Sequence, residues 1–246
     1  MIKIQYLDKY IETSLLEKDK ERSAKHTPSG KLSASRLGWP LQWQVLKAVG
    51  VPQEPLGEYV VRKFLRGRHI EDWLRETTPG LVAKEKFVEY RDVVGYIDAL
   101  VYMDGWNIPG VKGVIPHEIK SVTNAGFKWI VRDGYKKGHA LQGALYALAE
   151  GSEYFVIDYV ASDDYRVLSF LLKTEDFKEE VDGIIDAYEK QVETGWIPEF
   201  KSVEKWQENT KYNNYSEFVT AGPIEIDDIL MKKYPESYKK LKKETE

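Results

Sequence analysis

The stretch over residues 93–120 limits the fold most, because it has the pattern of two strands joined by a loop. Residues 93–102 and 114–120 are apolar and contain many β-branched side chains. The residues that interrupt the pattern between them are Gly105, Pro109, Gly110 and Gly113. The stretch therefore predicts a β-hairpin inside a sheet.

The predicted hairpin carries Asp98, Glu118 and Lys120 among apolar neighbours. Side chains alternate between the faces of a strand, so Glu118 and Lys120 project to the same side. If the register sets Asp98 across from Glu118, two carboxylates and one ammonium group converge. Two such close carboxylates repel each other, and a bound divalent cation relieves the repulsion. A metal that lowers the pKa of water, beside a lysine that steadies the nucleophile or the transition state, is suited to hydrolysing a phosphodiester.

The composition limits the chemistry further. The 246 residues include no cysteine, which excludes disulfides, a thiol nucleophile, cysteine-ligated zinc and an iron–sulfur cluster. With only 4 histidines, a metal site must be ligated mainly by oxygen, which favours Mg²⁺ or Mn²⁺. Because we find no signal-peptide core and no apolar stretch of membrane-spanning length, we expect an intracellular protein with no membrane partner, cytoplasmic or, if viral, in the host cytoplasm.

The net charge of −4 is spread unevenly along the chain. Residues 1–70 contain thirteen Lys and Arg against seven Asp and Glu, a net of +6, and residues 119–140 contain five against one, a net of +4. Attraction for a polyanion depends on this local potential and not on the total. The two regions are therefore compatible with DNA binding, although ordinary solvated helix faces would have the same composition.

Hydrophobic periodicity predicts an α/β domain with appendages. We expect a helical N-terminal region over residues 1–78, a core over residues 79–198 and a helical, basic tail over residues 199–246. The tail could mediate self-association, so the formation of a homo-oligomer is left open. The predicted helices span residues 6–25, 33–49, 57–76, 121–150 with a break at Gly134 and Gly138, and 174–194, the last capped by Thr174. The predicted strands outside the hairpin span residues 81–90, 154–161 and 166–172.

The order of Asp98, a glycine-rich loop and Glu118-Ile119-Lys120 resembles the PD-(D/E)XK nuclease superfamily. Gln142 and Tyr146, four residues apart on a predicted helix, are similar to the Gln-x-x-x-Tyr element of its RecB-like branch. The resemblance covers roughly residues 33–198. It implies a restriction-endonuclease-like core, in which a central mixed β-sheet is flanked by helices. It also implies that Gln142 and Tyr146 line the active site and orient the scissile phosphate or the catalytic lysine.

The resemblance also implies a set of metal ligands. RecB-like members have a histidine on a helix before the first core strand, and His69 stands at the matching place. The implied ligands are His69, Asp98, Glu118 and the carbonyl group of Ile119, with Lys120 assisting the attacking water. The chain departs from the CRISPR-associated RecB-like nucleases in having no cysteines for an iron–sulfur cluster. The helical arm must therefore be held by packing, for which Trp39, Trp43, Trp196 and Trp206 are available.

These features together predict a divalent-metal-dependent DNA nuclease, and we expect an exonuclease of DNA repair, recombination or viral replication. The alternatives are a structure-specific endonuclease, a non-catalytic DNA-binding module that keeps the fold, and a metal hydrolase of another phosphate ester. Five residues near the predicted helix pair are candidates for sequence-independent phosphate contacts. They are Lys128, Arg132, Lys136, Lys137 and His139.

Overall fold

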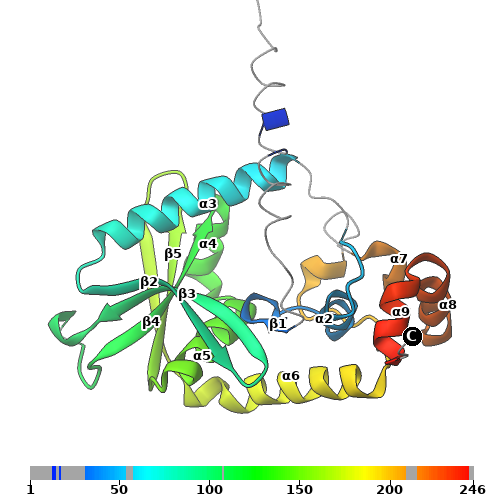
Figure 1. The fold of residues 1–246 in the computed structure, drawn as a ribbon. Coiled ribbons are helices and arrows are strands. Elements are labelled where there is room, and N and C mark those ends of the chain that lie inside the picture. Colours follow the sequence, from blue (N-terminus) through cyan, green and yellow to red (C-terminus); the bar gives the residue numbers. More distant parts are fainter. Residues whose placement is uncertain are drawn as a thin grey trace, which may run out of the picture.

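The computed structural model describes residues 31–53, 58–106, 108–208 and 215–243, together with Thr13, Ser14 and Glu17. Figure 1 shows a sheet with helices on both sides and a group of short helices beside it. The strands are β1 (Leu32–Ser33), β2 (Leu81–Tyr90), β3 (Val93–Tyr102), β4 (Val114–Val122), β5 (Tyr154–Ala161) and β6 (Val167–Lys173). The helices are α2 (Leu41–Ala48), α3 (Glu58–Thr77), α4 (Asn124–Asp133), α5 (Lys137–Glu150), α6 (Glu175–Thr194), α7 (Ser216–Val219), α8 (Pro223–Lys233) and α9 (Pro235–Lys242). Three short 3-10 turns are η1 (Ala34–Arg36), η2 (Asp104–Trp106) and η3 (Lys205–Glu208).

Strand β3 organises the mixed sheet. Along one edge it pairs antiparallel with β2. Its other edge is shared, because β1 pairs in parallel with Val93 and Val94 while β4 pairs antiparallel with residues 99–102. Beyond them, β5 runs parallel to β4, and β6 runs antiparallel to β5. In the described part of the chain, β3 thus has no strand partner on this edge between Val94 and Ala99, and Asp98 lies in that interval.

The two faces of the sheet are covered by different helices. Helix α3 packs on one face, where Ile70 and Leu74 lie in a core with Ile119 of β4. Helix α5 packs on the other face, and its Leu141 and Leu145 belong to a larger core that also includes residues of α2, α6 and the C-terminal helices. Because side chains alternate along β4, Glu118 and Lys120 point away from the face that Ile119 occupies.

The predicted α/β fold, a central mixed sheet flanked by helices, is confirmed. The predicted strands over residues 81–90, 93–102 and 154–161 are confirmed, and the predicted helix over residues 57–76 is α3. Within the described part of the chain, none of the helices has both the length and the apolarity that a membrane span needs. Trp39 and Trp43 pack edge to face at 5.9 Å, as expected for an arm held by packing.

Other expectations were wrong in detail. A continuous helix over residues 33–49 does not form, because Pro40 has no N–H and starts α2 after a separate 3-10 turn. Thr174 does not cap α6 through its side chain, since its hydroxyl donates to the carbonyl of Ser152. The predicted helix over residues 6–25 lies almost wholly outside the described residues. The division into three regions stays a prediction.

Candidate active site

Strands β3 and β4 bring Asp98 and Glu118 to the same point. The ladder pairs Ala99 with His117, and continuing this register sets Asp98 opposite Glu118. The ladder ends there, and Oδ2 of Asp98 instead accepts a hydrogen bond from the backbone N–H of Ile119 at 2.8 Å. A side-chain carboxylate therefore holds the two strands together where their backbones separate.

Glu118 is the most deeply buried charged group of the site, with 1% of its surface exposed. Its carboxylate contacts the ammonium group of Lys120, which is half-buried. Apart from this contact, neither oxygen of Glu118 has a hydrogen-bond partner among the described residues. Burial, together with the nearby charge of Asp98, raises the pKa of Glu118 to about 8. The buried acid is thus short of positive charge and of hydrogen-bond donors.

The pKa values of Lys120 and Asp98 are also shifted by burial and by the neighbouring charges. Burial disfavours the ammonium form of Lys120, but the carboxylates of Glu118 and Asp98 outweigh it and raise the pKa of Lys120. Burial raises the pKa of Asp98, against the opposing charge of Lys120 and the hydrogen bond from Ile119. Lys120 therefore stays protonated while it faces two acids that both resist ionisation.

Glu71 of α3 is a third acid near the cluster formed by Asp98, Glu118 and Lys120. The sequence analysis did not identify Glu71 as a candidate site residue. Burial and then the charge of Asp98 raise the pKa of Glu71, which also feels Lys120 and Arg75. Helix α3 approaches β4 closely at Gly67, where an added Cβ would lie 3.2 Å from Oγ of Ser121. Glu71 follows Gly67 by four residues and so lies on the same side of α3. The four-residue spacing between Gly67 and Glu71 was the sequence signal that could have identified Glu71.

His69, the predicted metal ligand, is exposed on α3. It lies two residues from both Gly67 and Glu71, which corresponds to a rotation of about 200° around the helix. The side of α3 that faces the sheet carries Gly67, Ile70, Glu71 and Leu74 instead. The structure therefore does not bring His69 to the cluster, and its role as a metal ligand stays a prediction with less support than one for Glu71.

Gln142 and Tyr146 lie on the side of α5 that faces the cluster. Nε2 of Gln142 donates a hydrogen bond to the hydroxyl of Tyr146 at 2.9 Å. Tyr146 is only 2% exposed, and burial followed by the charge of Glu118 raises its pKa. Its hydroxyl also reaches the backbone of Tyr96, on the unpaired interval of β3, where Gly95 leaves room for the ring. Tyr146 is thus placed to fix Gln142, and Gln142 is the more accessible member of the pair.

His139 is half-buried beside Tyr159 and Lys136. The Tyr159 hydroxyl accepts the backbone N–H of Lys136 and lies 2.9 Å from Nδ1 of His139. Burial, and then the charges of Lys120 and Lys136, hold the pKa of His139 well below its ordinary value. His139 is therefore neutral at neutral pH, and a phosphate contact through it would be a hydrogen bond and not an ion pair.

The other candidate phosphate contacts lie on the surface of α4 and the start of α5. Lys128 and Lys136 are exposed. Arg132 makes a bidentate pair with Asp133, with both distances 2.6 Å, and Lys137 pairs with Glu180 at 2.6 Å. A phosphate would have to compete with those acids for Arg132 and Lys137.

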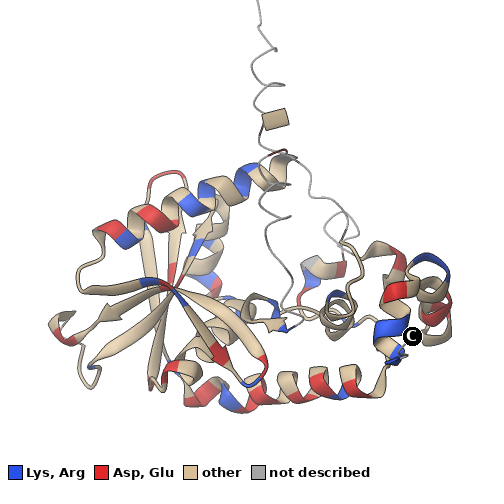
Figure 2. Cartoon of the chain, viewed as in Figure 1, with Lys and Arg blue, Asp and Glu red and all other residues tan. Residues whose placement is uncertain are grey.

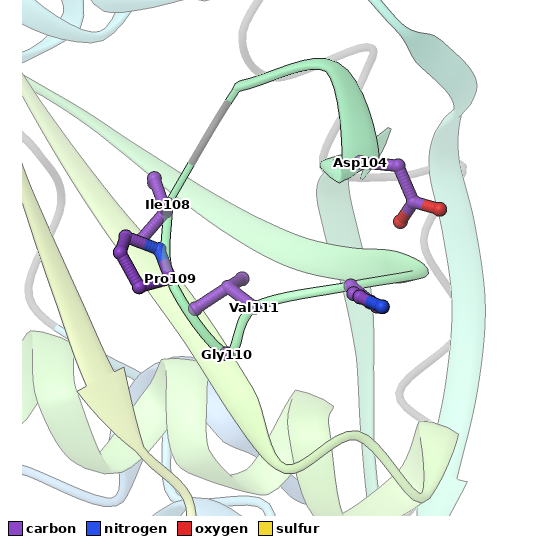
Figure 3. Close-up of a pocket in the computed structure, with 6 residues that line it drawn as sticks. Asp104, Ile108, Pro109, Gly110 and Val111 are labelled. Atoms are coloured by element: carbon purple, nitrogen blue, oxygen red, sulfur yellow. The ribbon is translucent and has the colours of Figure 1, made fainter.

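A pocket of about 430 Å³ lies in the loop between β3 and β4 and is separate from the cluster (Figure 3). Its one carboxylate, that of Asp104, already accepts hydrogen bonds from the Tyr102 hydroxyl at 2.7 Å and from the Gly113 N–H at 2.6 Å. Neither Asp98 nor Glu118 lines it. The lining residues are Asp104, Ile108, Pro109, Gly110, Val111 and Lys112.

The cluster fits a hard divalent cation better than a soft one. Asp98, Glu118 and Glu71 offer carboxylate oxygens only, and the oxygens of Glu118 accept no hydrogen bond among the described residues apart from the Lys120 contact. Among the described residues, no three Asp, Glu or His side chains converge into a ready-made site of three ligands. A metal would thus be held by two carboxylates at the fork of β3 and β4, the point next to Asp98 and Glu118 where the two backbones separate. Further ligands would come from the backbone or from water.

Comparisons with known proteins show the fold alone. No protein-family model and no curated protein matches the chain. The solved structure of SSO0001 is similar with a TM-score of 0.53 and 13% identity, over 86% of this chain and 96% of that one. Two structures of LHK-Exo match with TM-scores of 0.44, for a complex with dAMP, and 0.45, for the alkaline exonuclease from Laribacter hongkongensis. Their identities are 14% and 15%, over 67% of this chain and 90% of theirs.

Proposed function

We propose that this protein is a divalent-metal-dependent nuclease that hydrolyses phosphodiester bonds in DNA. The observation that carries the proposal is the carboxylate of Glu118, buried beside Lys120 at the fork where Asp98 crosses from β3 to β4. A buried carboxylate that has only the Lys120 ammonium as a partner and lies beside a second acid costs stability, and a cation at this point would offset that cost. The rival reading, a DNA-binding module without catalysis, leaves the buried acids unexplained.

Asp98 and Glu118 would hold the cation, with the carbonyl group of Ile119 as a third ligand. Glu71 is the side chain that we expect to complete the set in place of His69, because Glu71 lies near enough to Asp98 and Lys120 for their charges to shift its pKa. The oxygen-only donor set favours Mg²⁺ or Mn²⁺. When bound, such an ion activates water and offsets charge on the phosphate oxygens.

The remaining residues act on the substrate directly or through a neighbour. Lys120, kept protonated by its acidic neighbours, would stabilise charge that develops on the phosphate in the transition state. Gln142, fixed by Tyr146, would donate a hydrogen bond that orients the phosphate. Lys128 and Lys136 would contact the DNA backbone outside the cluster, which positions DNA without reading its sequence.

The experiment is incubation of linear and covalently closed circular DNA with the wild type and with Lys120→Ala, in Mg²⁺, Mn²⁺ or EDTA. We expect the wild type to degrade linear DNA only with a divalent ion and Lys120→Ala to lose this activity. A closed circle that survives supports an exonuclease, and a circle that is cut supports the endonuclease alternative. Binding of DNA without cleavage in any metal would overturn the proposal in favour of the non-catalytic module.

A further inference from the structure

The side of α3 that faces the sheet continues for two helical turns beyond the point where the sheet covers it. The core residues that α3 contributes to this face are Ile70 and Leu74. Val60, Lys63 and Phe64 precede Gly67 by seven, four and three residues, so they lie on the same side of the helix as Gly67. Figure 1 shows α3 along one side of the sheet, with its N-terminal end extending beyond the strands.

This uncovered part of α3 presents aromatic rings to solvent. Phe64 is 52% exposed and Tyr59 is 67% exposed. The ammonium group of Lys63 lies 4.4 Å from the centroid of the Tyr59 ring, which is a cation–π contact. Large exposed rings next to a cation on a helix face that points toward a candidate active site need a reason beyond folding, because burial gives them no stability there.

The charge of the same segment selects the partner. Residues 59–70 contain four basic residues, Arg62, Lys63, Arg66 and Arg68, and no acidic residue. After Glu58, the first residue of α3, the next acid of the helix is Glu71, at the candidate metal site, and Figure 2 shows the basic stretch followed by acids along the helix. Positive charge of this kind also opposes the helix dipole, since cations are unfavourable near an N-terminus. A polyanion is therefore the complementary ligand, and a protein surface rich in Lys and Arg is not.

We infer that Tyr59, Lys63 and Phe64 bind single-stranded nucleic acid and lead it to the fork of β3 and β4. Exposed aromatic rings stack on unpaired bases, whatever the sequence, while neighbouring cations follow the phosphates. The bases of an intact duplex are stacked on one another and offer no free face to Phe64. The inference rests on the proposed nuclease function and adds a strand preference to it: the bases next to the scissile phosphate are unpaired.

The position of Phe64 supports a role next to the chemistry. It precedes Glu71 by seven residues, which is two turns or about 10 Å along the helix axis. Between them stands Gly67, which is buried where α3 contacts Ser121 of β4. A base stacked on Phe64 would thus lie within two helical turns of Glu71, next to the candidate metal site.

The test measures binding and not cleavage. Fluorescence anisotropy of a labelled oligothymidylate and of a blunt duplex is recorded with the full chain in EDTA, for the wild type, Phe64→Ala, Tyr59→Ala and Phe64→Trp. Phe87→Ala is the matched control, because Phe87 on β2 is also 52% exposed. We expect Phe64→Ala and Tyr59→Ala each to weaken oligothymidylate binding by about fivefold or more, with duplex binding changed less. Phe64→Trp should bind like the wild type.

Three results would overturn the inference: unchanged oligothymidylate binding by Phe64→Ala, an equal loss with Phe87→Ala, or an equal loss for the duplex. Because the measurement needs no metal, the two proposals can fail separately. A wild type that binds oligothymidylate through Phe64 but cuts nothing with Mn²⁺ overturns only the nuclease function. A protein that cuts DNA but loses no binding in Phe64→Ala overturns only the stacking surface.

Discussion

Asp98 takes the place of a backbone carbonyl in the β3–β4 ladder, because its carboxylate accepts the Ile119 N–H at 2.8 Å. It therefore serves the strands and the proposed metal site together, and two variants separate these roles. Asp98→Asn keeps an oxygen acceptor for Ile119 and removes a charge that crowds Glu118, so its melting temperature in EDTA should equal or exceed that of the wild type. Asp98→Ala loses the acceptor and should be less stable by about 1–2 kcal/mol.

Neither variant should cleave DNA, since both remove an anionic metal ligand. Thermal unfolding and a nuclease assay with Mn²⁺ check the pair. Wild-type cleavage by Asp98→Asn would mean that the reaction does not depend on this carboxylate.

Glu71 and His69 offer a direct comparison between the geometry and the family resemblance. Glu71→Gln should reduce cleavage by about tenfold or more and should raise the concentration of Mn²⁺ needed for half-maximal activity, because a carboxylate near the metal is lost. His69→Asn should change neither quantity by more than about twofold, as expected for an exposed surface residue. The reverse order of effects would restore His69 as the metal ligand and exclude Glu71.

The stability of the metal-free protein should fall as the pH rises. The pKa of Glu118 is about 8 in the folded protein against an ordinary value of 4.5, so the folded state holds this proton more tightly than the unfolded state. Glu118 thus contributes stability that is fully present below about pH 4.5 and is lost as the pH rises to about 8. Glu118→Gln should avoid that loss. Its free energy of unfolding should exceed that of the wild type by about 2–4 kcal/mol at pH 9.

Denaturant unfolding in EDTA at pH 5 and pH 9 measures the effect. Glu179→Gln, at an exposed position of α6, is the control and should follow the wild type at both values. Adding Mn²⁺ at pH 9 should stabilise the wild type more than Glu118→Gln, because the variant lacks one of the carboxylates that would hold the ion. Equal pH dependence in the wild type and in Glu118→Gln would show that Glu118 ionises freely.

Gly95 should tolerate no side chain. An added Cβ would lie 2.7 Å from the Tyr146 ring and 3.0 Å from Cβ of Ala34, so Gly95→Ala must displace the tyrosine that fixes Gln142. We expect a loss of about 1–3 kcal/mol in stability and a lower kcat with little change in KM. Gly183→Ala meets nothing within 4 Å in the exposed middle of α6 and should gain about 0.5–1 kcal/mol.

Unfolding curves measure the stability of both glycine variants, and steady-state kinetics measure their kcat and KM. If Gly95→Ala is as stable and as active as the wild type, Tyr146 does not depend on the gap in β3.

The sequence by itself determined the elements and much of the cluster. Strong alternation and β-branched residues mark β3 and β5, and Gly and Pro residues punctuate the β3–β4 loop, since both signals are local. The period of two in β4 set Glu118 and Lys120 on one face, and the period of 3.6 in α5 set Gln142 near Tyr146. These are relations within one element, which spacing along the chain reports.

Only the tertiary structure decided which elements meet and which side of α3 faces the strands. The gap in β3 between β1 and β4 arises from pairings far apart in the sequence, and it creates the place for Tyr146. The rotation of α3 is set by the close approach of Gly67 to β4, which turns Glu71 inward and His69 outward. Helical periodicity alone defines neither direction, because the absolute phase of a helix depends on the surface it packs against.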